Sequence, residues 1–116
     1  MCLNLLTDTV SKVLDRVRIS ELLAAVGDPA RLDIIFLLGE AGPMNVGDIA
    51  NRFHLSRPAI SHHLKVLKTS RVVTSQKAGQ EVFYALDENV IIHELRTVLA
   101  GIEEACNKKA GEAALG

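Results

Sequence analysis

The sequence is poor in aromatic residues and has no long apolar run. Aromatic residues make up 3% of the 116 residues, with no Trp, although 48% of the chain is hydrophobic. We therefore predict one globular unit with a mainly aliphatic core. No apolar stretch approaches the roughly 18 residues of a membrane-spanning helix, and the sequence does not open with the charged-then-apolar order of a secretion signal. We expect one cytoplasmic domain, residues 1–116, with no membrane partner.

The chain also offers few groups suited to covalent chemistry. Its two cysteines, Cys2 and Cys106, lie near opposite ends of the sequence and do not make a disulfide framework. A reducing compartment keeps such thiols reduced. No Gly-rich phosphate loop is present, and no nucleophile, base and orienting group cluster by spacing. We therefore expect that the protein is not an enzyme.

Acidic residues are absent from one long segment. Between Arg52 and Gln80 the chain has six Lys and Arg residues and no Asp or Glu, whereas the remainder carries the other seven basic residues and all fourteen acidic ones. A formal charge of −1 therefore conceals a segment of charge +6 and a body of charge −7. Because clustered positive charge attracts a phosphate backbone, this segment indicates a nucleic-acid partner.

A helix-turn-helix falls in this basic segment. Residues 46–53 have the pattern of a short helix, and Ser56, with Pro58 in the first turn, begins a second helix over residues 56–69. Ile60, Leu64 and Leu67 form the apolar stripe of the second helix, and such a helix can lie in the DNA major groove. From this helix we expect DNA contacts at Ser56, Arg57, Pro58, Ser61, His62, Lys65 and Lys68.

Further helices are predicted on both sides of this pair. Apolar residues at helical spacing cover residues 7–26, as one long or two short helices, and residues 87–109. Asp28 caps a helix with Pro29 at its first position. The buried side of that helix is predicted to be Leu32, Ile35, Phe36 and Leu38. On the last helix, Glu94, Arg96, Glu103 and Glu104 face away from the apolar stripe, and residues 110–116 are expected to be disordered.

After Ser70 the hydrophobic period changes from helical to alternating. Two short strands, residues 72–77 and 80–86, reverse near Gly79, for which we predict a positive φ in a loop of three or four residues. A hairpin directly after a recognition helix is a wing, here residues 72–86. Its tip residues Gln76 and Lys77 are suited to phosphate or minor-groove contact. The alternative is a hairpin that only edges the core.

Together these elements predict a mainly α fold with a small β-hairpin, a winged helix-turn-helix of about five helices and a two-stranded wing. Three stretches resemble the ArsR/SmtB family of dimeric winged-helix repressors: residues 28–32, residues 55–67 with the run SHHLKVL, and Gly79 followed by Val82, Tyr84 and Leu86. The resemblance implies homodimers on operator DNA, base contacts at Arg57, Pro58, Ser61 and His62, and release by metals, metalloids or oxidants. Arg71 stands where many members have a glycine.

The first and last helices carry more apolar surface than so small a domain needs. The resemblance implies that these helices pack across a two-fold axis, which would place two recognition helices about one DNA turn apart. The interface residues that we predict are Val10, Leu14, Ile91, Leu95, Val98, Leu99 and Ile102.

The metal ligands of the resembled family are largely missing. Asn45 and Gly47 stand where metal-responsive relatives have cysteines, and around His93 the corresponding positions are Ile91, Glu104 and Asn107. One imidazole and one carboxylate do not hold a transition metal tightly, so we predict no metal site and no cofactor. A thiol sensor at Cys2 and Cys106, responding to an oxidant or a thiophilic metal, is one hypothesis. The alternatives, with both thiols inert, are an unidentified organic or protein effector and no effector at all.

The sequence therefore favours a sequence-specific DNA-binding transcriptional regulator. We expect a repressor that binds a palindromic operator in double-stranded DNA as a homodimer and is controlled by an effector. The alternative is a winged-helix module for protein–protein contact without its own operator. Such a module would not need a basic segment free of acidic residues, and electrophoretic retardation of promoter fragments distinguishes the two.

Overall fold

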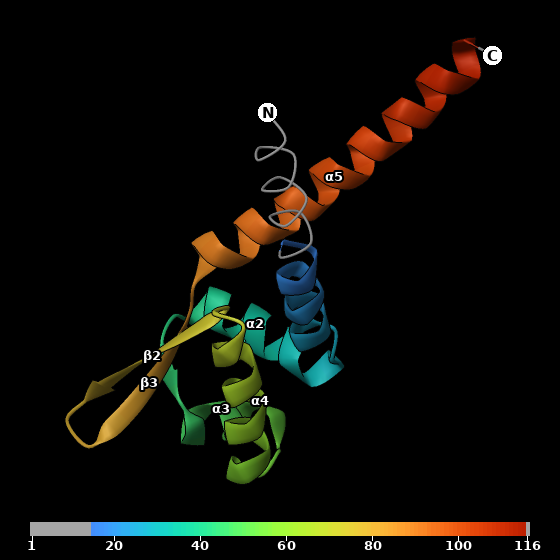
Figure 1. The fold of residues 1–116 in the computed structure, drawn as a ribbon. Helices are drawn as coiled ribbons and strands as arrows, with labels where there is room; N and C mark the ends of the chain where they lie inside the picture. The colour runs from blue at the N-terminus through green and yellow to red at the C-terminus, as the bar shows by residue number, and fades with distance from the viewer. Residues whose placement is uncertain (1–14, 116) are drawn as a thin grey trace.

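The computed structural model describes the chain from residue 15 to residue 115, with side chains to residue 109. This part folds into five helices and one three-stranded antiparallel sheet (Figure 1). A first helix covers residues 15–26. It is followed by α2 (Pro29–Ala41), β1 (Met44–Asn45), α3 (Val46–Phe53), α4 (Arg57–Thr69), β2 (Val73–Ala78), β3 (Glu81–Leu86) and α5 (Glu88–Leu115). The predicted winged helix-turn-helix is confirmed.

The core lies where α2, α3 and α4 meet the base of the sheet. Its most deeply buried side chains are Ile34, Ile49, Ile60, Leu64, Leu67, Val72 and Val73. All are aliphatic, as the scarcity of aromatic residues led us to expect. The first helix adds Leu22 and Val26 to the same core, and α5 adds Ile91.

The buried side of α2 differs from the predicted one. Ile35 and Leu38 are buried, but Leu32 and Phe36 are 42% and 61% exposed. Ile34 is buried instead, together with Leu37. The sequence from Leu32 to Leu38 has apolar residues on every side of the helix, so its periodicity does not specify a face. Contacts of α2 with α4 and β3 decide which face turns inward.

The sheet has the strand order β1-β3-β2. β2 and β3 form the predicted hairpin, with Val73 opposite Leu86 and Ala78 opposite Glu81. Its loop therefore has two residues rather than three or four, and Gly79 takes the predicted positive φ, at 65°. A Gly at the first position of a two-residue loop suits a II′ turn, whose twist matches that of the strands. β1 was not predicted, because its two residues are too few to show alternation.

α5 begins where predicted and extends further than predicted. Asp87 precedes it and accepts from the backbone N–H of Val90 at 3.3 Å. The helix continues to Leu115, so the expected disorder after residue 109 is wrong, because the Ala, Glu and Leu of this segment are good helix formers. In Figure 1, α5 projects from the body on the side away from α3 and α4. No helix in the described part of the chain is both long and apolar enough to cross a membrane.

Candidate nucleic-acid interface

The turn between α3 and α4 is built from local capping contacts. The side chain of Asn45 accepts from the backbone N–H of Asp48 at 2.8 Å and starts α3. His54 ends α3 in the left-handed conformation, with φ of 55°. Ser56 then accepts from the N–H of Ala59 at 3.2 Å and starts α4. These contacts fix the path of the chain from one helix into the other.

The two sides of α4 differ sharply in burial. Ile60, Leu64 and Leu67 are almost completely buried and hold the helix on the core. The predicted DNA-contacting residues of this segment, Ser56, Arg57, Pro58, Ser61, His62, Lys65 and Lys68, are all exposed. The structure therefore brings these residues together on one surface, which we call the α4 face.

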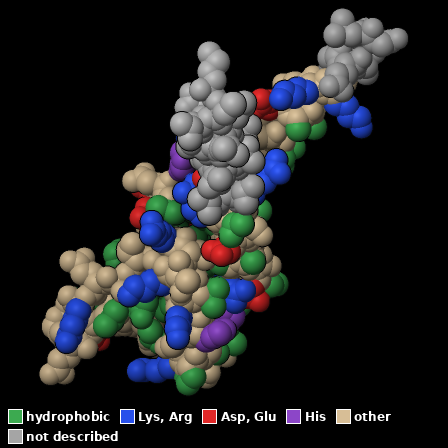
Figure 2. All heavy atoms as spheres, in the orientation of Figure 1, with side chains coloured by type: hydrophobic (Ala, Val, Ile, Leu, Met, Phe, Trp, Pro, Cys, Tyr) green, Lys and Arg blue, Asp and Glu red, His purple; other side chains and the backbone are tan. Residues whose placement is uncertain are grey.

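The wing continues the α4 face. Gln76 and Lys77 are exposed on β2, close to the hairpin loop. Lys68 on α4 donates from Nζ to Oγ of Ser75 on β2 at 2.6 Å, a contact between helix and wing that the sequence pattern did not indicate. Figure 2 shows Lys and Arg side chains spread over the wing and the neighbouring helices. The positive charge is thus shared between the wing and the neighbouring helices.

Arg57 lies against the start of α3. A Cβ added to Gly47 would lie 2.9 Å from Nη2 of Arg57, so a side chain at position 47 would displace the guanidinium from this place. The same two residues line a small hollow together with Gln80 and Glu81 of the wing. In the sequence Gly47 was notable only as a missing cysteine. In the structure it makes room for a predicted base-contacting side chain.

The adjacent histidines of α4 face different environments. His62 is exposed on the α4 face, whereas His63 is half-buried, and their rings are 6.0 Å apart and tilted. Nη1 of Arg31 lies 3.3 Å from Nδ1 of His63. Arg31 also donates from Nε to the carbonyl of Ala25, at the end of the first helix, at 2.5 Å. The sequence pattern did not indicate this role of Arg31, although the residue lies in the stretch 28–32 that resembles the ArsR/SmtB family.

The described residues among the predicted interface and sensor positions lie outside the α4 face. Val10, Leu14 and Cys2 are not among the described residues. Leu95, Leu99 and Ile102 are 41%, 56% and 56% exposed. Val98 is half-buried and Cys106 is exposed.

The prediction that Ile91 belongs to the dimer interface was wrong. Its side chain is 7% exposed, because it packs into the chain's own core and is not available to a partner. Between residues 15 and 109, no group of three or more His, Cys, Asp or Glu side chains is arranged to hold a metal ion.

A second apolar surface runs along the first helix and α5. Its exposed members that were not predicted are Val17 and Leu23 on the first helix and Ile92 on α5. Ile19, Leu23, Val98 and Ile102 line a hollow of about 660 Å³ between the two helices. The described part of the chain leaves this surface uncovered.

Comparisons with known proteins agree with this architecture. The model of the family "Bacterial regulatory protein, arsR family" matches residues 28–75, from the cap of α2 into β2. The chain is 39% identical to the transcriptional repressor SdpR of Bacillus subtilis, over 72% of this chain and 91% of that protein. It is 31% identical to an arsenical resistance operon repressor of Staphylococcus xylosus, over 81% of this chain and 94% of that protein.

Solved structures show the same fold. An ArsR-like transcriptional regulator from Rhodococcus superposes with a TM-score of 0.79 at 27% identity, covering 87% of this chain and 94% of that chain. A homodimeric winged helix-turn-helix DNA-binding domain from Mycobacterium bovis superposes with a TM-score of 0.64 at 23% identity, covering 80% of this chain and 84% of that chain. The likeness in each case extends beyond the segment matched by the family model.

Proposed function

The chain belongs to the arsR family of bacterial regulatory proteins, and we propose that it represses transcription by binding a palindromic operator as a homodimer. The observation that carries this proposal is the α4 face, which combines exposed hydrogen-bonding side chains with a segment that contains no acidic residue. Two relatives that the chain spans almost completely are named as repressors. The compartment in which we propose that it acts is the cytoplasm.

The proposed DNA contacts fall into two groups. Arg57, Ser61 and His62 lie near the start of α4 and would meet base edges in the major groove, because the first turns of a recognition helix enter it. Lys68 and Lys77 would meet phosphates on either side. Phosphate contacts fix the register of a protein on DNA and add affinity for any sequence, whereas base contacts supply the sequence preference.

The proposed homodimer rests on the uncovered surface of the first helix and α5. A helix of 28 residues is about 42 Å long, and the Cα radius of gyration is 18.6 Å, whereas a compact chain of 116 residues would have one of about 13 Å. Leu95, Leu99 and Ile102 would leave a large apolar surface in water. The domain from Mycobacterium bovis with the same fold is homodimeric.

The experiment is a titration of fluorescent promoter fragments against random duplexes of equal length at several salt concentrations. If each subunit neutralises about four phosphates, log K against log salt has a slope near −7. A slope shallower than about −2, with no preference for any promoter fragment, would leave the module for protein–protein contact as the better description.

We also propose that an effector controls DNA binding. Cys106 is exposed on α5, beside the surface assigned to the dimer. Oxidation of this thiol, or capture of a thiophilic metal ion, would change the packing of the two α5 helices and with it the spacing of the recognition helices. Replacement of both cysteines by serine distinguishes such a thiol effector from another small molecule.

A further inference from the structure

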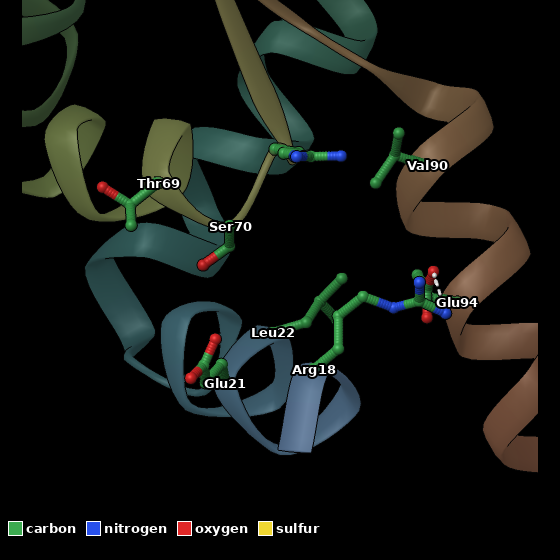
Figure 3. A pocket seen from close by; sticks show the side chains of 8 residues that line it. Arg18, Glu21, Leu22, Thr69, Ser70, Val90 and Glu94 are labelled. Atoms are coloured by element: carbon green, nitrogen blue, oxygen red, sulfur yellow. Dashed lines mark ion pairs between the residues drawn. The ribbon is translucent and has the colours of Figure 1, made fainter. Parts of the chain in front are cut away.

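A cavity of about 470 Å³ lies where three parts of the chain meet. Arg18, Glu21 and Leu22 of the first helix form one wall, Thr69, Ser70 and Arg71 at the end of α4 form another, and Val90 and Glu94 of α5 form the third. Figure 3 shows the open space between these walls. Its volume is within the roughly 300–1,000 Å³ of small-molecule sites.

Glu94 supplies a buried acceptor in this cavity. The sequence predicted that it faces away from the apolar stripe, but it is 8% exposed, because the first helix covers it, and it is the single buried charged residue between residues 15 and 109. Oε1 lies 3.4 Å from Nη2 of Arg18, as the dashed line in Figure 3 marks. Oε2 is buried and has no hydrogen-bond donor in the described part of the chain. A buried carboxylate oxygen without a donor is rare in folded proteins.

Arg71 supplies the opposite charge from another wall. It follows α4 with φ of 65°, a conformation that glycine adopts readily and a branched or long side chain does not. Its backbone is held there because its N–H donates to the carbonyl of Lys68 at 3.0 Å. Its side chain lines the cavity and forms no ion pair with any described residue. The positive φ ends α4, as His54 ends α3, and the turn that it makes brings the Arg71 side chain to the cavity wall.

We propose that this cavity binds a small zwitterion of the α-amino-acid class. The ammonium group donates to the carboxylate of Glu94, and the carboxylate of the ligand accepts from the guanidinium of Arg71. Arg18 remains paired with Oε1 of Glu94 and holds that side chain in place. An anion alone would leave the Glu94 carboxylate with one oxygen lacking a donor, and a cation alone would leave Arg71 without an ion pair, so the pair of opposite charges selects a zwitterion.

The cavity is placed so that its occupant acts on the recognition helix, and this step rests on the proposed function. Arg71 follows α4 directly, and the carbonyl of the next residue, Val72, accepts from the N–H of Asp87 at the start of α5 at 2.8 Å. A molecule held between Glu94 and Arg71 therefore sets the distance between α5 and the end of α4. Because α5 belongs to the proposed dimer surface, that distance determines how two recognition helices are presented to an operator.

The test measures the binding of the twenty L-amino acids to the full chain, by thermal shift and then by calorimetry, with acetate and methylamine as singly charged probes. At least one amino acid is expected to bind with a dissociation constant below about 1 mM, and neither singly charged probe is expected to bind. Arg71→Gly suits the positive φ and is expected to weaken binding at least tenfold, as is Glu94→Gln. Arg96→Ala, on the same helix but outside the cavity, is expected to bind like the parent.

Two results would overturn the proposal. One is that no amino acid binds the parent, and the other is that Arg71→Gly and Glu94→Gln both bind as tightly as the parent. Because calorimetry requires no DNA, these results are independent of whether the chain retards promoter fragments. If the chain binds an amino acid but prefers no promoter fragment, the repressor proposal is overturned and the assignment of the cavity as an amino-acid site stands.

Discussion

The guanidinium of Arg31 lies 3.3 Å from Nδ1 of His63 and joins α2 to the half-buried side of the recognition helix. The same side chain donates to the carbonyls of Ala24 and Ala25 at the end of the first helix. One residue thus connects three helices through polar contacts. It also satisfies two carbonyls that the end of an α-helix leaves without partners.

Replacing this residue tests that connection. Arg31→Ala is expected to lower the free energy of unfolding by about 1–3 kcal/mol, because it removes the cap of the first helix and leaves His63 without its donor. Urea denaturation of purified protein measures the change. Arg96→Ala, which removes an exposed arginine of α5, is expected to change it by less than about 0.5 kcal/mol. Equal effects of the two variants would show that the Arg31 contacts add nothing to stability.

The proposed base contacts and phosphate contacts are separable by mutation. Arg57→Ala or His62→Ala is expected to reduce discrimination between operator and random DNA by about 1–3 kcal/mol, because each removes a contact to a base edge. Lys77→Ala is expected to weaken both complexes alike and to reduce the steepness of the salt slope by about two, because each subunit of the dimer loses one phosphate contact. Fluorescence anisotropy with matched duplexes measures each quantity. Uniform losses for all three variants would remove Arg57 and His62 from the base-reading set.

A charge on the exposed side of α5 tests the homodimer. Leu99 is 56% exposed in the single chain, so Leu99→Glu is expected to leave the helical circular dichroism intact while it separates the subunits, since a buried carboxylate without a partner is costly. Sedimentation is expected to show twice 12.6 kDa for the parent and 12.6 kDa for the variant. Operator binding should be lost together with the dimer. A parent that sediments at the mass of one chain would contradict the assignment, and Arg96→Glu is the matched control.

The cap of α2 predicts a dependence on pH. The backbone N–H of Arg31 donates to Oδ2 of Asp28, and this bond, with the nearby Arg31 guanidinium, holds the pKa of Asp28 below its ordinary value. Because the pKa is lower in the folded than in the unfolded chain, the ionised carboxylate stabilises the fold above about pH 4, and this stabilisation is lost as the pH falls through the folded value.

Asp28→Asn keeps a capping oxygen but cannot ionise. The parent is expected to exceed the variant in urea midpoint by a constant amount between about pH 5 and pH 7, and the difference is expected to shrink below about pH 4. A difference that stays constant to pH 2, or that grows as the pH falls, would contradict the role given to the charge.

The thiol hypothesis predicts loss of response without loss of binding. The Cys2→Ser, Cys106→Ser double variant is expected to bind the operator like the parent and to ignore mild oxidants and thiophilic metals, which should weaken the parent's complex. Zinc or nickel is expected to bind either protein no more tightly than about micromolar, because a lone imidazole and carboxylate make a poor site. If the double variant responds like the parent, the thiols have no part in sensing.

Local signals in the sequence were sufficient for most of the fold. The caps at Asp28, Asn45 and Ser56 and the positive φ at Gly79 follow from side-chain chemistry within a few residues, so the helix starts and the wing could be predicted. The wrong face of α2, the core position of Ile91 and the burial of Glu94 have a different origin. Each depends on which neighbouring element covers a given side, and single-chain periodicity does not contain that information.

For the candidate site too, the sequence predicted what lies within one helix but not the contacts between elements. The exposed residues of α4 follow from its period, because three apolar residues determine which side faces the core. The bond from Lys68 to Ser75 and the contact of Arg57 with Gly47 join residues from different elements, and no spacing rule indicates them. The cavity between the first helix, α4 and α5 likewise exists only once these three elements are assembled.

The contact between Arg57 and Gly47 has a consequence for the entropy of DNA binding. An arginine free in water loses up to about 2 kcal/mol of rotamer freedom when it becomes fixed, and this loss reduces the affinity of any complex that it joins. Here the guanidinium lies beside Gly47 at the start of α3, which reduces the number of rotamers open to Arg57 in the free protein. Gly47, one helix away, would therefore contribute to affinity by leaving room for this conformation of Arg57, the side chain proposed to contact a base.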